Sequence, residues 1–220
     1  MKILLNDILQ YSDAPEPLKS PMLSERTSIN ETIINLDKNR QINAIGIGNT
    51  DGTSFDIIFN DAANTTFTFR FIGNGLYCMD SIISASKIRI NTNATYVGRI
   101  GAGLGIHIPT SIAKEPGFVS TAEPRITLSG QVINGLGGYN YRILSLDSRY
   151  KIDEVAMNEI QEGYNTIGAG FPFFIDLTDE SYKLPFSKFY ATEIDQKKMS
   201  FEGGIRKYLY SRRWYFEEKF

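Results

Sequence analysis

Hydrophobic and polar residues alternate along the stretch from residue 33 to residue 60, which predicts a series of half-buried antiparallel strands. The alternation is clearest where Phe55, Ile57 and Phe59 occupy every second position. Clusters of Gly, Asn and Asp bound the alternating segments, as expected for turns. The predicted strands are Ile33–Asp37, Gln41–Ile47 and Ser54–Asn60, joined by Lys38-Asn39-Arg40 and by residues 48–53.

The same pattern of short strands and turns continues to about residue 135. Further strands are predicted at Thr65–Ile72, Gly75–Ser81, Lys87–Asn91, Tyr96–Ile100 and Arg125–Ile133. In one of them Phe67, Phe69 and Phe71 share a face, which predicts an aromatic inner wall. Many short strands separated by turn residues indicate a mainly β fold, an antiparallel β-sandwich or jelly roll.

The pattern changes after the glycine-rich break at residues 135–138. Apolar residues recur at helical spacing between Ile152 and Tyr164, which predicts a helix over Ser148–Gly163. Ser148 or Asp147 could cap its start, and Gly163 could end it. Around this helix the pattern predicts four strands, at Tyr139–Asp147, Phe171–Leu177, Phe186–Glu193 and Ile205–Glu218.

These patterns divide the chain into an N-terminal strand and arm (1–24), a β-sandwich (25–135) and a C-terminal β-α-β-β-β part (139–220). The last part is either a separate small domain or a continuation of the first sheet. Residues 11–24 contain three of the eight prolines and are predicted to form an arm that grips a neighbouring subunit or a surface-tethered linker. Residues 101–123, rich in Gly and Pro, predict a long loop around a short strand near Ile106–Ile108, and such loops are typically functional or disordered.

Composition removes several classes of function. The net charge of −2 lacks the basic surplus of a non-specific DNA-binding protein. Cys78 is the only cysteine, which excludes an intramolecular disulfide, and a single histidine removes most metal and acid–base motifs. No apolar stretch reaches the length of a membrane span, and the first residues do not resemble a signal peptide, so we expect folding in a cytoplasm.

The residues that could carry catalysis do not form a known motif. Residues 46–52 and 101–105 are glycine-rich, but no helix follows to receive a phosphate, so a hairpin turn and a flexible or tightly packed loop are expected instead. His107 could be combined with Ser111 and Asp56, yet no strained nucleophile turn is present. We expect His107 to be structural or exposed and Cys78 to be a buried small hydrophobe.

Acidic residues offer two further candidate sites. Asp51 and Asp56, with Asn49 and Asn60 nearby, are oxygen ligands of the kind that calcium takes, but they lie in a hairpin without a dedicated ligand loop. Three glutamates of the predicted helix are interpreted as a solvated face in preference to a glycoside-hydrolase pair: Glu154, Glu159 and Glu162. We therefore predict no catalytic residue, no cofactor and no metal.

The last predicted strand carries aromatic residues together with arginine. Its candidates for an interface or a ligand surface are Tyr208, Tyr210, Arg212 and Trp214. Aromatic residues beside arginine suit a sugar-stacking surface, a protein interface or a sheet core, and all three interpretations stay open. Arg206, Lys207, Arg212 and Arg213 could form a local basic patch, although Glu217 and Glu218 offset it, so nucleic acid is not expected.

Two family resemblances bear on function. The stretch INLDKNRQINAIGIGNTDGTSFDIIF resembles the opening strands of galactose-binding-like (discoidin-type) sandwiches, although Asn35 departs from their Ile-Asp-Leu pattern. The segments ERTSINETIINL, GRIGAGLG, EPGFVSTAEPRITLSGQV, FPFFIDLTDE, LPFSKFY and YSRRWYFEEKF are similar to virion proteins of tailed bacteriophages. The second resemblance implies a structural component of a phage tail or neck.

These observations lead to two functional hypotheses. The first is a non-enzymatic virion subunit, a minor tail or tail-tip component that forms a ring with copies of itself and contacts other virion proteins. The alternative is a carbohydrate-binding module that attaches the particle to a host glycan. In the first, the 101–123 loop makes a subunit contact, and in the second it forms the rim of a ligand site.

Overall fold

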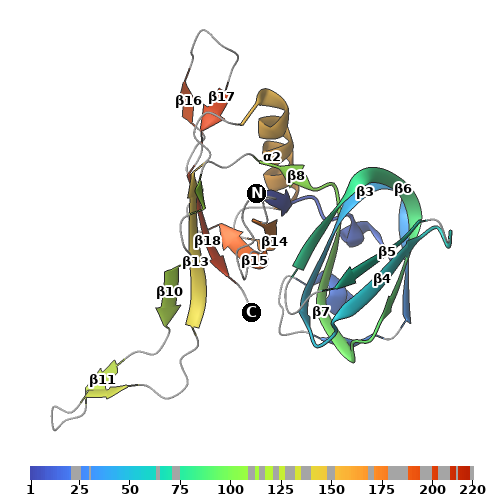
Figure 1. Cartoon of the computed structure of the whole chain (residues 1–220), viewed down its shortest axis with the longest axis horizontal. Helices are drawn as coiled ribbons and strands as arrows, with labels where there is room; N and C mark the ends of the chain where they lie inside the picture. The colour runs from blue at the N-terminus through green and yellow to red at the C-terminus, as the bar shows by residue number, and fades with distance from the viewer. Residues whose placement is uncertain are drawn as a thin grey trace.

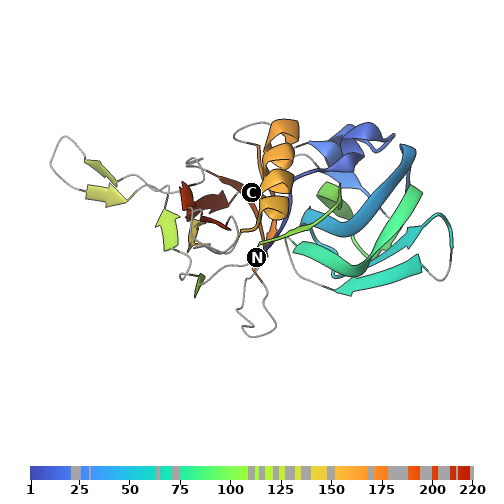
Figure 2. The same ribbon diagram turned by 90° about the horizontal axis from the view of Figure 1, so that it is seen from above.

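The computed structural model describes two main β-sheets, one helix of fourteen residues and two short helical turns. Figures 1 and 2 show a curled sheet at one end of the molecule and a second, flatter sheet beside it. The described residues are 1–20, 26–29, 31–62, 65–70, 75–108, 112–113, 117–120, 124–126, 132–134, 140–147, 152–167, 171–177, 188–193, 200–202, 209–211 and 213–218.

The first half of the chain forms the curled sheet. Its six strands are β2 (Thr27–Ser28), β3 (Glu31–Thr50), β4 (Ser54–Phe59), β5 (Thr66–Arg70), β6 (Gly75–Thr92) and β7 (Tyr96–Gly103). They pair in the order β2-β7-β3-β6-β4-β5, and every pairing is antiparallel.

The two long strands, β3 and β6, bend and carry the sheet over onto itself. The first part of β3 pairs with the last part of β6, which also pairs with β4. The second part of β3 pairs with the first part of β6 and with β7. The result is a sandwich made from one sheet, whose two halves share β3 and β6 and face each other across a common core (Figure 1).

The bend corrects the predicted strand boundaries. The segments Ile33–Asp37 and Gln41–Ile47 are parts of one strand, and Gly75–Ser81 and Lys87–Asn91 are likewise parts of β6. Register shifts between Asn35 and Arg40, and between Ile42 and Ala44, mark the irregularities at which β3 bends. The polar triplet at residues 38–40 is thus a bend within a strand, where the sequence pattern predicted a turn between strands.

The sandwich core confirms the alternation read from the sequence. Phe55, Ile57 and Phe59 of β4 have no exposed surface, and they pack with residues of β3, β6 and β7 in one cluster. Phe67 and Phe69 of β5 pack against this cluster from its rim, while Thr66 and Thr68 are exposed. The predicted aromatic inner wall is confirmed for these two residues, and Phe71 lies outside the described residues.

The N-terminal arm covers one end of its own sandwich. After β1 (Lys2–Leu4) the chain forms a 3₁₀ turn, η1 (Ile8–Tyr11), and a one-turn helix, α1 (Glu16–Lys19). Leu9 and Leu18 have no exposed surface and belong to the sandwich core. Residues 8–20 of the arm therefore pack within the same chain, and the remainder of the arm to residue 24 lies outside the described residues.

The second sheet combines both ends of the sequence. Its strands are β1, β8 (Ile106–His107), β9 (Ile112–Ala113), β10 (Gly117–Ser120), β13 (Asn140–Asp147), β14 (Phe173–Asp176), β15 (Lys188–Glu193) and β18 (Arg213–Glu218). The order is β10-β13-β18-β15-β14-β1-β8, with β9 also paired to β13. Parts of the predicted 101–123 loop are thus strands, because β7 extends to Gly103 and β8 to β10 join the second sheet.

Each face of the second sheet has its own apolar contact. Ile3, Phe173 and Ile175 pack with helix α2 (Glu154–Ile167) through Ile160. Leu4 and Phe174, at the alternate positions, pack against Ala44 and Leu76 on the outer face of the sandwich. The outer face of the sandwich is flat at that contact because Gly46 and Gly101 pair across β3 and β7, and a Cβ atom at residue 46 would lie 2.2 Å from the Phe174 ring.

Helix α2 differs from its prediction at both ends. It begins at Glu154, and the Asp153 carboxylate accepts a hydrogen bond from the Ala156 N–H (2.8 Å). Asp153 therefore caps the helix, a role that the sequence analysis gave to Ser148 or Asp147. Asp147 ends β13, and Ser148 lies outside the described residues. Gly163 does not end the helix, which continues to Ile167. The glycine instead allows a close approach between the helix and Leu5, because it has no side chain.

The remaining strands form two ribbons outside the main sheets. β11 (Pro124–Ile126) pairs with β12 (Val132–Asn134), and β16 (Ser200–Glu202) pairs with β17 (Leu209–Ser211). Both ribbons project from the body of the molecule in Figure 1. The predicted fold class, mainly antiparallel β with one long helix in the C-terminal part, is confirmed. The division at residues 135–139 stays a prediction.

Candidate functional site: the polar face of the β-sandwich

The outer surface of β3, β4, β5 and β6 carries a continuous array of polar and charged side chains. It occupies the half of the sandwich turned away from the second sheet. We call it the polar face and define it by Glu31, Asn35, Asp56, Asp61, Thr68, Lys87, Arg89 and Asn91. All of these side chains are exposed or half-buried.

Strand register places the polar face in rows that run across the sheet. One row follows Thr68, Asp56, Asn91 and Glu31 through β5, β4, β6 and β3. Residues that are paired directly across antiparallel strands project from the same side of the sheet. The adjacent row contains two apolar residues, Ile33, which is 44% exposed, and Ile58, which is half-buried.

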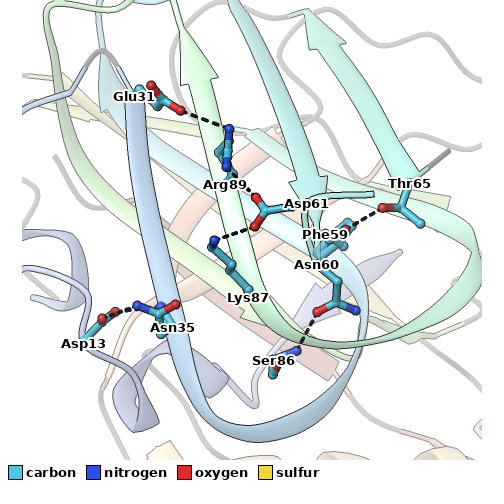
Figure 3. Close-up of polar contacts among 10 residues, drawn as sticks. All are labelled: Asp13, Glu31, Asn35, Phe59, Asn60, Asp61, Thr65, Ser86, Lys87 and Arg89. Atoms are coloured by element: carbon cyan, nitrogen blue, oxygen red, sulfur yellow. Dashed lines mark hydrogen bonds and ion pairs between the residues drawn. The ribbon is translucent and has the colours of Figure 1, made fainter. Parts of the chain in front are cut away.

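A turn between β4 and β5 is fastened onto β6 at one end of this face. Asn60 and Asp61 have φ angles of 52° and 56°, values that asparagine and aspartate adopt more readily than most residues. The Asn60 side chain accepts from the Ser86 N–H (3.0 Å) and donates to the Ser84 carbonyl (3.0 Å). These contacts, drawn in part in Figure 3, fix the direction of the next side chain, Asp61.

Asp61 is the centre of a charge network. Its carboxylate lies 2.5 Å from Lys87 Nζ and 2.6 Å from Arg89 Nη2, and Arg89 Nη1 lies 3.4 Å from Glu31 (Figure 3). The hydrogen bond from Lys87 is the main cause that lowers the pKa of Asp61, and Arg89 adds to it. The four side chains hold one another in place, so they present fixed charges of both signs at the surface.

A second contact anchors the N-terminal arm beside this network. The Asp13 carboxylate accepts from the backbone N–H of Asn35 and from its side-chain amide, both at 2.7 Å (Figure 3). The Asn35 side chain is the main cause that lowers the pKa of Asp13. The polar face therefore offers ordered hydrogen-bond donors and acceptors, a chemistry that suits binding of a polar ligand.

The two calcium candidates have separate structural contacts, Asp51 in a turn and Asp56 within β4. The Asp51 carboxylate accepts from the N–H groups of Thr95 (2.9 Å) and Tyr96 (3.2 Å), and it orders the turn that precedes β7. Asp56 accepts from the Thr68 hydroxyl across β4 and β5 (2.6 Å). Within the described ranges, no group of three or more His, Cys, Asp or Glu side chains could hold a metal ion.

The other single candidates occupy separate places. His107 is exposed in β8, where its register partner is Lys2, whereas Asp56 belongs to the other sheet and Ser111 lies outside the described residues. Cys78 is half-buried against the cluster of Leu4, Ala44, Leu76 and Phe174. Three glutamates of α2 are exposed, as predicted for a solvated face: Glu154, Glu159 and Glu162.

The predicted aromatic strand is divided between two sheets. Tyr210 belongs to β17 of a projecting ribbon and pairs with Phe201. Trp214 belongs to β18 of the second sheet and pairs with Leu146. Tyr208 and Arg212 lie outside the described residues, as do Arg206 and Lys207 of the predicted basic patch. The structure therefore separates Tyr210 from Trp214, which the sequence placed on one strand face.

The polar face itself was not among the predicted sites. Its signal was present in the sequence as KIRIN, where Lys87, Arg89 and Asn91 alternate with buried isoleucines. That alternation predicted a strand, but it does not show which strands lie beside it. The charge network depends on Glu31 and Asp61, which are brought to β6 by pairing over long sequence separations.

Comparisons with known proteins gave distant structural likenesses. No protein-family model matches the chain, and no curated protein sequence matches it. Chitosan-binding module 1 of a chitosanase/glucanase from Paenibacillus sp. IK-5 is similar at a TM-score of 0.29 and 12% identity, over 41% of this chain and 90% of that one. A predicted alpha-L-fucosidase from Bacteroides ovatus is similar at a TM-score of 0.32 and 12% identity, over 88% of this chain and 34% of that one. Both TM-scores are too low for these likenesses to carry an argument. No helix within the described ranges has the length and apolar character needed to cross a membrane.

Proposed function

We propose that this protein is a non-enzymatic structural subunit that assembles with copies of itself, and that its two β-ribbons make contacts between copies. The observation that carries the proposal is that β11–β12 and β16–β17 each form a two-stranded sheet of their own, outside both main sheets. A two-stranded ribbon is marginally stable alone in water, and packing against another surface stabilises it. Both ribbons project from the body in Figure 1, where a neighbouring copy can reach them.

The resemblance to tailed-phage proteins suggests the kind of assembly. We propose a minor tail or tail-tip component of a virion, in which copies close into a ring and contact other virion proteins. The two ribbons project from different sides of the molecule in Figure 1. A contact between two unlike surfaces of neighbouring copies generates a ring when the rotation between copies closes. Tyr210, one of the residues predicted for an interface, belongs to one of these ribbons.

Sedimentation velocity and negative-stain imaging across a dilution series test the assembly. We expect the wild-type chain to form closed rings in a concentration-dependent manner. Replacing residues 200–211 with a short Gly-Ser linker should leave the circular dichroism spectrum similar and shift the protein to monomer. The control is Val155→Ser on the exposed face of α2, which should assemble as the wild type does. A wild type that stays monomeric at every concentration, or a ribbonless variant that still forms rings, would contradict the proposal.

Binding of a host glycan by the polar face is the second candidate function. It is supported by the ordered row of Thr68, Asp56, Asn91 and Glu31, whose exposed or half-buried oxygen and nitrogen atoms suit sugar hydroxyl groups. On a glycan array the wild-type chain should bind a defined set of oligosaccharides. Asp56→Ala should weaken that binding about tenfold, which corresponds to roughly 1.4 kcal/mol, without lowering the Tm. An array without binding, or equal binding by Asp56→Ala, argues against this site.

A further inference from the structure

Strand β5 is one of the two edge strands of the sandwich sheet, and β2 is the other. β5 pairs with β4 along one edge, and no strand of the described part of the chain pairs with its other edge. An unpaired strand edge exposes a row of backbone N–H and C=O groups that another strand can bind. The five residues of β5, TFTFR, alternate regularly and contain neither proline nor glycine, so the strand retains the geometry for pairing.

The apolar side chains of β5 are only partly covered. Phe67 packs edge-on against Phe59 at 5.9 Å between ring centroids, and Phe69 lies over Tyr77 at 4.3 Å. Both phenylalanines remain half-buried, although they belong to the face that turns toward the sandwich core. A further strand beside β5 would cover them, which makes strand addition at this edge favourable beyond its hydrogen bonds.

The geometry points to the ribbon β16–β17 of a neighbouring copy as the strand that adds to β5. This inference rests on the proposed function and names the contact surface for one ribbon. β16 has the sequence Ser200-Phe201-Glu202, and β5 ends in Thr68-Phe69-Arg70. Each segment is a polar residue, a phenylalanine and a charged residue, and the two charges are opposite.

Charge complementarity sets the expected register. With residue 201 opposite residue 69, residue 202 lies either directly opposite Arg70 or diagonally from it, depending on strand direction. Both positions are within reach of a long arginine side chain. Arg70 is exposed and forms no ion pair with another residue in the described ranges, so it is available to a partner.

Charge reversal and mixing test this contact in the full-length chain. We expect Arg70→Glu and Glu202→Arg each to weaken self-association at least about tenfold, because each places like charges together. Mixing the two variants in equal amounts should restore assembly. In the mixture, the glutamate introduced into β5 of one chain meets the arginine introduced into β16 of the other, while the opposite pair of surfaces keeps the wild-type combination. Lys38→Glu, an equal charge change at an exposed position on the bend of β3, is the matched control and should assemble normally.

The outcomes separate this inference from the proposed function. If both single variants assemble as the wild type does, or if the mixture stays dissociated, the β5 contact is wrong. Rings that require the ribbon but tolerate Arg70→Glu would mean that the ribbon binds elsewhere on the neighbouring copy, and the proposed function would stand. A wild-type chain that never self-associates would overturn both. Similar thermal unfolding of all variants shows that lost assembly does not reflect lost folding.

Discussion

Replacing Arg99 with methionine is expected to destabilise the protein by about 3–5 kcal/mol at neutral pH, because it leaves the Asp7 carboxylate buried without its cation. Arg99 of β7 donates through Nη2 to Asp7, and the two side chains are only 13% and 14% exposed. The other oxygen of Asp7 accepts from the N–H groups of Leu9 and Ala102, both at 3.0 Å. This carboxylate therefore joins η1 to the sandwich. Urea unfolding of wild type and variant measures the difference.

The stability lost in Arg99→Met should depend on pH in a direction that the pKa of Asp7 determines. Burial is the main influence on Asp7 and raises its pKa, while Arg99 opposes that effect. Without Arg99, the pKa of Asp7 in the folded chain should rise further above its unfolded value. When a carboxyl group has a higher pKa in the folded chain than in the unfolded chain, the stability that results is complete at pH values below the unfolded pKa. It is lost as the pH rises through the pKa of the folded chain. The deficit of Arg99→Met should therefore be smallest in acid and grow toward neutral pH.

The double variant Asp7→Asn/Arg99→Met is the control. The asparagine oxygen can still accept from Leu9 and Ala102, and no uncompensated charge remains, so most of the lost stability at neutral pH should return. Equal stability of Arg99→Met and wild type at pH 7 would show that the pair contributes little. The buried Arg99 Nε and Nη1 have no hydrogen-bond partner among the described residues, so within that part of the chain the pair is incompletely satisfied.

The sequence predicted the β class and much of the sandwich core because those features are local. Phe55, Ile57 and Phe59 had to share a face of a strand wherever that strand lay, and their complete burial follows from the alternation. The continuity of β3 through residues 38–40 was not predicted. A polar triplet has the same composition in a turn and in a bend, and only pairing with β6 distinguishes them. Bulges of this kind depend on a partner strand that the local pattern does not contain.

Contacts between distant segments account for what the sequence did not predict. β1 lies between β8 and β14, with residue 2 paired to residues 107 and 176, and its three residues give no sign of this. Gly46 was predicted within a strand and Gly101 within a loop; both lie within strands, and the sequence did not show that they pair with each other beneath Phe174. The polar face likewise depends on register across four strands. The two ends of the predicted aromatic strand belong to different sheets, because one end pairs with β16 and the other with β13.

The second large effect is expected at the contact between the two sheets, where the Phe174 ring packs closely against two glycines. Phe174 is 2% exposed, and its ring lies on the surface formed by Gly46 and Gly101. Phe174→Ala should destabilise the chain by about 3–5 kcal/mol through lost burial and the cavity left behind. Gly46→Ala should cost about 1–3 kcal/mol, since its Cβ would lie 2.2 Å from the ring and the ring or the strand must move. Guanidinium unfolding measures each cost.

A double-mutant cycle separates this contact from a general effect of alanine in β3. In the Phe174→Ala background the added methyl group at residue 46 meets no ring, so Gly46→Ala should cost much less there than in the wild type. Gly101→Ala is the matched control, because its Cβ would lie 3.2 Å from the same ring, and a small displacement can relieve that contact. Its cost should be clearly smaller than that of Gly46→Ala. Additive costs for Gly46→Ala and Phe174→Ala would mean that the two residues do not meet in solution. The packing of the second sheet on the sandwich would then have to depend on other residues.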